Sequence, residues 1–175
     1  VAFNFLLVML FVLPVDLLFQ HLTRGENSLL LYQQFLTWVL YVIQSSLGIE
    51  VYIRGENSTI LAYADIIDME IVAECSGLHE TVFLSLLVLC FRGVKPMVRA
   101  KWAIYAAIFI FVENLIRILS GYYLINIYDF STWDKFHYFW WHTGQYALIM
   151  GVFVLWVMTI AGMPENKSVK KNFIR

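Results

Sequence analysis

Charged residues are scarce in this sequence: Asp, Glu, Lys and Arg make up 14% of its 175 residues, whereas 61% are apolar. A soluble domain carries charge on roughly a quarter of its residues, because its surface must face water. The few charges here are clustered between long apolar stretches. The composition therefore excludes an ordinary soluble domain and predicts a protein that crosses a membrane several times.

Positive charge and cysteine are limited as well. There are 12 Lys and Arg against 13 Asp and Glu, so the net charge is −1 and nucleic acid is not expected as a partner. The two cysteines, Cys75 and Cys90, are too few for a disulfide scaffold and are not paired as in a zinc ribbon. Cys90 lies in an apolar run without a nearby base, and we expect it to be inert.

Five apolar stretches are long enough, the third only barely, to cross a hydrocarbon core of roughly 30 Å. A lipid-exposed segment must satisfy its own backbone hydrogen bonds, and the alternating pattern of a membrane barrel is absent. The sequence therefore predicts an all-α polytopic bundle of about five transmembrane helices. The stretches are residues 3–19, 29–47, 76–91, 102–127 and 139–163.

The distribution of Lys and Arg predicts the orientation of this bundle. Four basic residues lie in the connector 92–101 and four in the tail 164–175, which places both on the cytoplasmic side. The connectors 48–72 and 128–138 then lie outside. We expect one integral membrane domain over residues 1–175, in which 48–72 forms an outer β-rich loop and 164–175 a basic cytoplasmic tail.

The connector 48–72 contains two runs of alternating apolar and polar residues on either side of Arg54-Gly55-Glu56-Asn57. This alternation around a turn-forming tetrapeptide predicts a short β-hairpin on the outer face. Two roles are open for the hairpin. It could cover the helix ends as a lid, or it could offer a strand edge that pairs with an extended peptide.

Ionisable side chains inside membrane helices are costly, so they are as a rule functional or paired. The predicted topology places three groups of polar residues, on three helices, at about the same depth near the outer interface. This convergence is the main functional signal in the sequence. The groups are Glu74, Cys75, His79 and Glu80; Glu113, Asn114 and Arg117; and His137, His142 and Gln145.

Cys75, Arg117 and His142 together favour nucleophilic catalysis, because a thiol needs a base and its acyl intermediate needs a nearby positive charge. Cys75 stands where the β-rich loop turns into a helix, and the positive end of the helix dipole favours a thiolate there. Each residue also has a structural interpretation. Cys75 could pack as a small apolar residue, and Arg117 could form a salt bridge with Glu113 or Glu80.

Three motifs carry a family resemblance. They are Cys75-Ser76-Gly77-Leu78 after an outer β-rich loop, Asn114-Leu115-Ile116-Arg117-Ile118 in the next membrane helix, and a histidine followed by a glycine in the last. Along most of its length the chain resembles the exosortase and archaeosortase membrane transpeptidases. The resemblance implies a multi-pass cell-membrane enzyme without a cofactor, with its active site near the outer face.

The resemblance also implies the reaction and the partners. Such an enzyme cuts a C-terminal sorting signal, made of a short motif, an apolar helix and a basic tail, from exported proteins. It forms a thioester and passes the protein to a lipid or envelope acceptor. Carried over to this sequence, the nucleophile is Cys75, the arginine is Arg117 and the histidine is His142. Supporting or binding roles fall to Asn114, His137, Glu74 and Gln145.

Two positions depart from the family pattern. The interval between His142 and Gly144 is shorter than usual, so His137 stays open as the catalytic histidine. Glu74 stands where many members have a small residue. An acid next to Cys75 would raise the pKa of the thiol unless Arg117 offsets it.

Two other functions stay open. One is a metal-dependent membrane hydrolase or oxidase, although neither His-Glu-x-x-His nor a repeated Glu-x-x-His occurs. The other is a non-catalytic membrane scaffold in which Arg117 pairs with an acid and Cys75 packs. Metal content and the reactivity of Cys75 would distinguish these functions from a transpeptidase. The candidate metal ligands are His79, Glu80, Glu113, His137 and His142.

Overall fold

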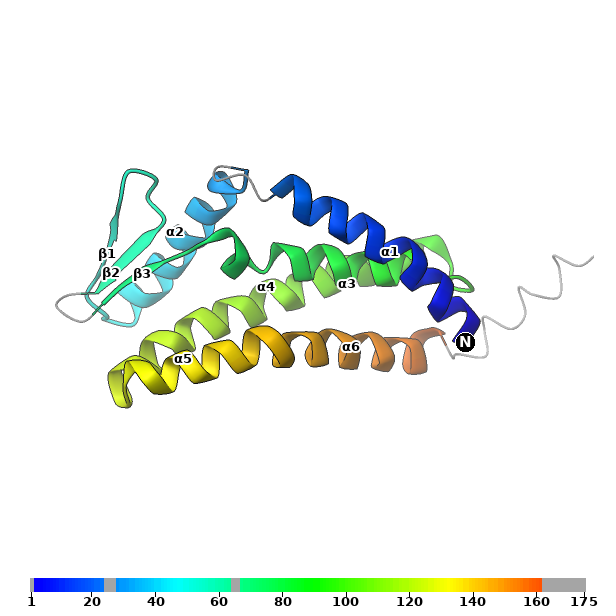
Figure 1. The fold of residues 1–175 in the computed structure, drawn as a ribbon. Helices are drawn as coiled ribbons and strands as arrows, with labels where there is room; N and C mark the ends of the chain where they lie inside the picture. The colour runs from blue at the N-terminus through cyan, green and yellow to red at the C-terminus, as the bar shows by residue number, and fades with distance from the viewer. Residues whose placement is uncertain (1, 24–27, 64–66, 162–175) are drawn as a thin grey trace, which may run out of the picture. The chain divides into compact units, whose positions relative to one another are not determined.

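The computed structural model describes residues 2–23, 28–63 and 67–161, and most of them are helical (Figure 1). A three-stranded sheet and short 3-10 and π turns complete the structure. The helices are α1 (Ala2–Thr23), α2 (Leu30–Ser46), α3 (Leu78–Cys90), α4 (Pro96–Ile127), α5 (Phe130–Phe139) and α6 (Gln145–Trp156). The strands are β1 (Val51–Arg54), β2 (Ile60–Tyr63) and β3 (Ile67–Glu70). The short turns are η1 (Ala73–Ser76), η2 (Trp140–Gly144) and η3 (Val157–Ala161).

The chain divides into two compact units. The helical unit consists of the described residues within Val1–Asp16, Glu80–Ile110 and Lys135–Arg175. The sheet unit consists of those within Leu17–His79 and Phe111–Asp134. Four helices, α1, α3, α4 and α5, contribute to both units because a boundary falls inside each of them.

The helical unit is held together by apolar side chains from α1, α3, α4 and α6. In α4, Ala103, Ala106 and Ile110 recur at helical spacing, so one stripe of the helix is buried, and the small alanines let neighbouring helices approach closely. Phe91 packs edge-on against Trp156, with ring centroids 5.5 Å apart. The buried core consists of Val8, Val12, Leu84, Leu87, Val88, Phe91, Val94, Ala103, Ala106, Ile110, Ile149, Phe153 and Trp156.

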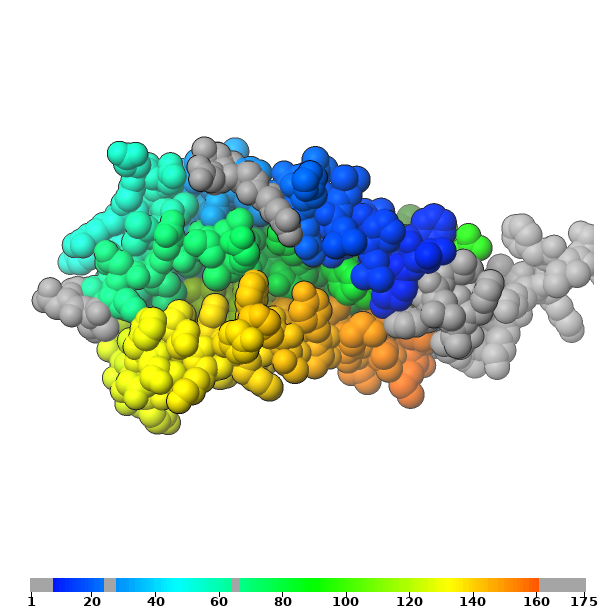
Figure 2. Space-filling model, viewed as in Figure 1, coloured from blue at the N-terminus to red at the C-terminus, as the bar shows by residue number. Residues whose placement is uncertain are grey.

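The sheet unit is built on an antiparallel sheet in the order β1-β2-β3. Its strands are short, and along β3 half-buried and exposed side chains alternate with the period of two that a pleated strand requires. Leu36 and Leu40 of α2 are fully buried in one cluster with Val51 of β1 and Leu61 of β2. In the space-filling view the side chains of the strands, cyan to green, lie against one another (Figure 2).

A buried polar pair joins α2 to the sheet. Gln44 Nε2 donates a hydrogen bond to the Tyr63 hydroxyl at 2.8 Å, and this hydroxyl donates to Gln44 Oε1 at 3.0 Å. Tyr122 of α4 stacks on the Tyr63 ring, with centroids 4.5 Å apart. Burial raises the pKa of Tyr63 to about 12, and the hydrogen bond with Gln44 opposes this shift.

The sheet differs from the predicted hairpin. β1 and β2 form the hairpin around the expected turn, with Val51 opposite Tyr63, but β3 extends it to three strands. Residues Ile67–Glu70 also alternate between apolar and acidic side chains, so their pattern is that of a half-buried strand.

The connector 128–138 is also not the loop that the sequence predicts, because α5 begins at Phe130. Asp129 explains this start: its Oδ1 accepts a hydrogen bond from the Thr132 backbone N–H at 2.6 Å, as an N-cap residue does.

Two helical segments among the described residues are long and apolar enough to cross a membrane: Pro96–Ile127 and Phe130–Ile160. Val8–Thr23 and Leu78–Cys90 are shorter apolar helices. The number of five transmembrane helices therefore stays a prediction. The predicted cytoplasmic tail 164–175 lies outside the described residues.

Candidate active site

Cys75 lies in a short turn between the sheet and α3. We call residues 73–77 the Cys75 turn. The chain leaves β3 in an extended conformation at Val72, forms the 3-10 turn η1, and enters α3 at Leu78. The Cys75 N–H donates to the Val72 carbonyl oxygen at 3.0 Å. Cys75 thus precedes α3 rather than opening it, and its side chain is partly exposed.

Gly77 ends the turn with a backbone that glycine adopts most readily. Its φ is +72°, in the left-handed region. A Cβ at this position would also lie 2.8 Å from Cγ of Asn114. Both the backbone conformation and the close approach of α4 therefore require glycine directly after Cys75-Ser76.

Asn114 of α4 fixes the main chain of the Cys75 turn. Its Nδ2 donates to the carbonyl oxygens of Cys75, at 3.1 Å, and Ser76, at 2.9 Å. Asn114 and Ser76 are both 1% exposed. The buried Ser76 carbonyl and the partly buried Cys75 carbonyl thus both accept from one amide, so losing the amide would remove this donor from both.

Arg117 lies three residues after Asn114, on the same face of α4. Its Nη2 donates to Asn114 Oδ1 at 2.6 Å and lies 3.4 Å from the Cys75 carbonyl oxygen, a longer hydrogen bond. The side chain is buried, so its positive charge is held at the main chain of the candidate nucleophile. Within the sheet unit the structure therefore brings together Cys75, Asn114 and Arg117.

Cys75 and Cys90 are both outside disulfides and differ in their surroundings. Cys90 packs against the apolar core of the helical unit, as expected from the sequence. Glu74, next to Cys75 in the turn, has an exposed side chain.

His142 belongs to the helical unit and lies in the π turn η2. Its Nδ1 is 3.0 Å from the Tyr138 carbonyl oxygen. The centroids of the His142 and Tyr138 rings are 4.0 Å apart. A carbonyl oxygen only accepts, so this hydrogen bond requires the proton on Nδ1 and makes Nε2 the basic nitrogen. The imidazole is exposed. π turns occur often at functional sites.

The other histidines and Gln145 occupy separate positions. His137 lies in the last turn of α5 and Gln145 opens α6, where it is buried; both belong to the helical unit. His79 belongs to the sheet unit. Its Nε2 lies 3.4 Å from Thr23 Oγ1 and its ring packs edge-on against Phe19.

The described part of the chain contains no cluster of metal ligands that would support the metal-site alternative. No three His, Cys, Asp or Glu side chains there are grouped so that they could hold a metal ion.

Sequence reasoning did not assign roles to Ser76 and Gly77. The carbonyl oxygen of Ser76 accepts a hydrogen bond from Asn114. Gly77 has no side chain, which leaves room for Asn114 next to it. Besides the motif Cys75-Ser76-Gly77-Leu78, the sequence offers one physical signal for Gly77, a glycine at the junction of a strand-like segment and a helix, which favours a left-handed residue there.

Comparison with known proteins gives a family for the whole described chain. The family model of transmembrane exosortases (Exosortase_EpsH) matches residues 1–161. No curated protein and no solved structure matches the chain. The match covers the Cys75 turn, the Asn114–Arg117 pair and His142, and it confirms the family resemblance seen in the sequence. The chain belongs to the transmembrane exosortase family.

Proposed function

We propose that this protein is a membrane cysteine transpeptidase that uses Cys75 as its nucleophile to cleave a C-terminal sorting signal. Family membership implies a cysteine transpeptidase in protein sorting in general terms. The observation that carries the assignment to Cys75 is the pair of α4 side chains, Asn114 and Arg117, that binds its main chain.

In the first half-reaction His142 takes the proton of the Cys75 thiol at Nε2, the thiolate attacks the carbonyl carbon of the scissile peptide bond, and a C–S bond forms. Arg117 stabilises the oxyanion of the tetrahedral intermediate, since its buried guanidinium carries a permanent charge. The C–N bond then breaks and the leaving amine takes a proton from His142. The products are a thioester on Cys75 and the released apolar helix with its basic tail.

In the second half-reaction a nucleophilic group of the acceptor attacks the thioester carbonyl. His142 takes the proton of that group, the C–S bond breaks, and the Cys75 thiolate is restored. The acceptor is a lipid or another envelope component. The Nδ1 contact with Tyr138 supports His142 as the base, because it leaves Nε2 to exchange the proton.

The substrate is an exported protein anchored by its own apolar helix. Its scissile segment lies just outside the cell membrane, where we place the Cys75 turn by the predicted topology. Two long apolar helical segments, Pro96–Ile127 and Phe130–Ile160, support a multi-pass membrane location for the enzyme.

The two cysteines provide the test. Cys75→Ala should abolish cleavage of a co-expressed exported protein that ends in an apolar helix and a basic cluster, whereas Cys90→Ala should cleave it nearly as the wild type does. Peptide mapping of the wild type by mass spectrometry should detect a thioester on the peptide that contains Cys75. Normal cleavage by a folded Cys75→Ala variant would contradict the proposal and favour a non-catalytic scaffold.

A further inference from the structure

The strand β3 has an edge that pairs with no other strand among the described residues. The Ile71 N–H donates to the Thr59 carbonyl oxygen at 2.9 Å, so in this register Ile67, Met69 and Ile71 bond to β2. The main-chain N–H and C=O groups of Asp68 and Glu70 therefore point away from β2. Within the described residues no hydrogen bond to these outer groups is found.

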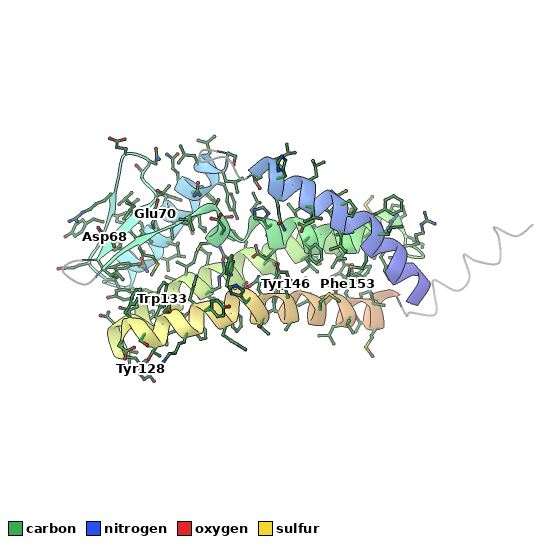
Figure 3. The ribbon with its side chains drawn as sticks, viewed as in Figure 1. Asp68, Glu70, Tyr128, Trp133, Tyr146 and Phe153 are labelled. Carbon is green, nitrogen blue, oxygen red and sulfur yellow. The ribbon has the colours of Figure 1, made fainter. Side chains whose placement is uncertain are left out.

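The side chains along this edge leave it accessible. Asp68 and Glu70 are exposed, whereas Ile67 and Met69 are half-buried. Figure 3 marks both acidic residues on β3. An exposed edge of this kind can accept an extended peptide as an added strand, with main-chain hydrogen bonds at every second residue.

The edge leads directly to the candidate nucleophile. Only residues 71–74 separate Glu70 from Cys75. The chain runs from β3 through the Cys75 turn into α3 (Figure 1). A peptide that follows the edge of β3 toward its C-terminal end is thereby guided to the Cys75 turn.

We propose that the outer edge of β3 binds the extended segment of the substrate that precedes the scissile bond, as an added parallel strand. This inference rests on the proposed function. Under that function the substrate passes from an extended outer segment into an apolar membrane helix. The enzyme passes in the same direction from β3 through the Cys75 turn into the apolar helix α3. Parallel alignment therefore places the scissile bond, which follows the bound segment, at the level of Cys75.

Disulfide cross-linking tests both the edge and the direction. The enzyme carries Cys75→Ala and Cys90→Ala, so that the substrate stays uncleaved, together with either Asp68→Cys or Glu70→Cys. The probe is a reporter fused to the C-terminal segment of an exported protein from the same genome that ends in an apolar helix and a basic cluster. Single cysteines are placed at successive positions before its apolar helix. Tyr52→Cys, an exposed position on β1, is the matched control.

We expect Asp68→Cys and Glu70→Cys each to cross-link to one preferred substrate position. The position for Glu70→Cys should lie about two residues nearer the apolar helix, because parallel strands advance together. Tyr52→Cys should give no preferred position. The reverse order, or equal cross-linking from Tyr52→Cys, would overturn the inference.

The proposed function and this inference can fail separately. If wild-type enzyme cleaves the probe and neither β3 cysteine cross-links to it, the β3 inference is wrong and the transpeptidase proposal survives. If both β3 cysteines cross-link in the expected order but Cys75→Ala alone still cleaves, the edge binds the substrate and the assignment of Cys75 is wrong.

A proline variant gives an independent measurement. Glu70→Pro removes an N–H that points away from β2, so the sheet should persist, since edge strands tolerate proline at such positions. We expect a KM for the probe raised about tenfold or more and a rate of Cys75 alkylation by a small reagent within about twofold of wild type. Unchanged KM in Glu70→Pro would contradict binding at this edge.

Discussion

Asn114 connects Arg117 to the main chain of Cys75: its Oδ1 accepts a hydrogen bond from Arg117 Nη2 at 2.6 Å, and its Nδ2 donates to the Cys75 carbonyl oxygen at 3.1 Å. One amide thus orients the cation and the backbone of the candidate nucleophile together. The arrangement uses both the acceptor oxygen and the donor nitrogen of the Asn114 side chain. An amide supplies both groups, whereas a carboxylate only accepts and an ammonium only donates.

Asn114→Asp should separate these two functions. The carboxylate can still accept from Arg117 but cannot donate to the carbonyls of Cys75 and Ser76, so the turn should move away from α4. The Cys75 carbonyl keeps its longer hydrogen bond from Arg117, whereas leaving the buried Ser76 carbonyl unsatisfied costs about 1–3 kcal/mol. We expect a lower unfolding temperature and a changed rate of Cys75 alkylation. Asn126→Asp, at an exposed position of α4, is the control; equal effects in both variants would contradict the positioning role.

Arg117→Lys should retain positive charge but lose the planar donor geometry that reaches Asn114 and the Cys75 carbonyl together. We expect substrate cleavage to fall strongly in Arg117→Lys and by about 10²–10³-fold or more in Arg117→Ala, the loss typical of removing an oxyanion donor. Single-turnover cleavage measures this. Arg54→Ala, an exposed arginine of β1, should cleave normally. Full activity of a folded Arg117→Ala enzyme would exclude a catalytic role.

Gly77→Ala tests the close approach of α4. Alanine at φ +72° is strained by about 1–2 kcal/mol, and its Cβ would in addition lie 2.8 Å from Asn114 Cγ. Gly48 has a φ of +78° with nothing within 4 Å, so Gly48→Ala carries the backbone strain alone. We expect Gly77→Ala to destabilise the protein more than Gly48→Ala and to lower cleavage. Thermal unfolding in detergent that ranks the two variants equally would show that the contact with Asn114 is unimportant.

His142→Gln should lower cleavage by about 10²–10⁴-fold, the usual contribution of a general acid and base. His137→Gln should retain most activity, since the hydrogen bond with Tyr138 supports His142 as the base. Thioester formation and transfer, followed separately by mass spectrometry, should both slow in His142→Gln. The opposite ranking of the two variants would assign the base to His137.

Tyr63→Phe should destabilise the sheet unit by about 1–3 kcal/mol, because the buried Gln44 amide loses its partner. The double variant Tyr63→Phe/Gln44→Leu should recover part of this loss, as removing both polar groups does. If the double variant is as unstable as the sum of the single ones, the pair does not interact.

The same tyrosine predicts a pH dependence. The fold favours the neutral phenol, because its pKa is raised from 10.0 to about 12 by burial. The stability from this group is therefore complete below pH 10 and is lost as the pH rises toward 12. Wild type should lose more stability than Tyr63→Phe between pH 9 and 11, measured as unfolding temperature in detergent.

The sequence by itself determined the class of the protein and the family. Apolar stretches such as residues 102–127 predict long helices, because in lipid the backbone N–H and C=O groups of a single segment can form hydrogen bonds only with one another. The motifs around Cys75 and Arg117 identify the family, which the family match confirms. The alternation at Val51–Arg54 and Ile60–Tyr63 predicts two strands, because side-chain direction follows a period of two.

Only the tertiary structure decided how these parts meet. That Asn114 bonds to the carbonyls of both Cys75 and Ser76 depends on the distance between α4 and the Cys75 turn, which are far apart in the sequence. The close approach of Asn114 to the Cys75 turn also explains why residue 77 is a glycine. The third strand depends on pairing with β2. Sequence periodicity reports which side of an element is buried, but long-range hydrogen bonds decide which partner covers it.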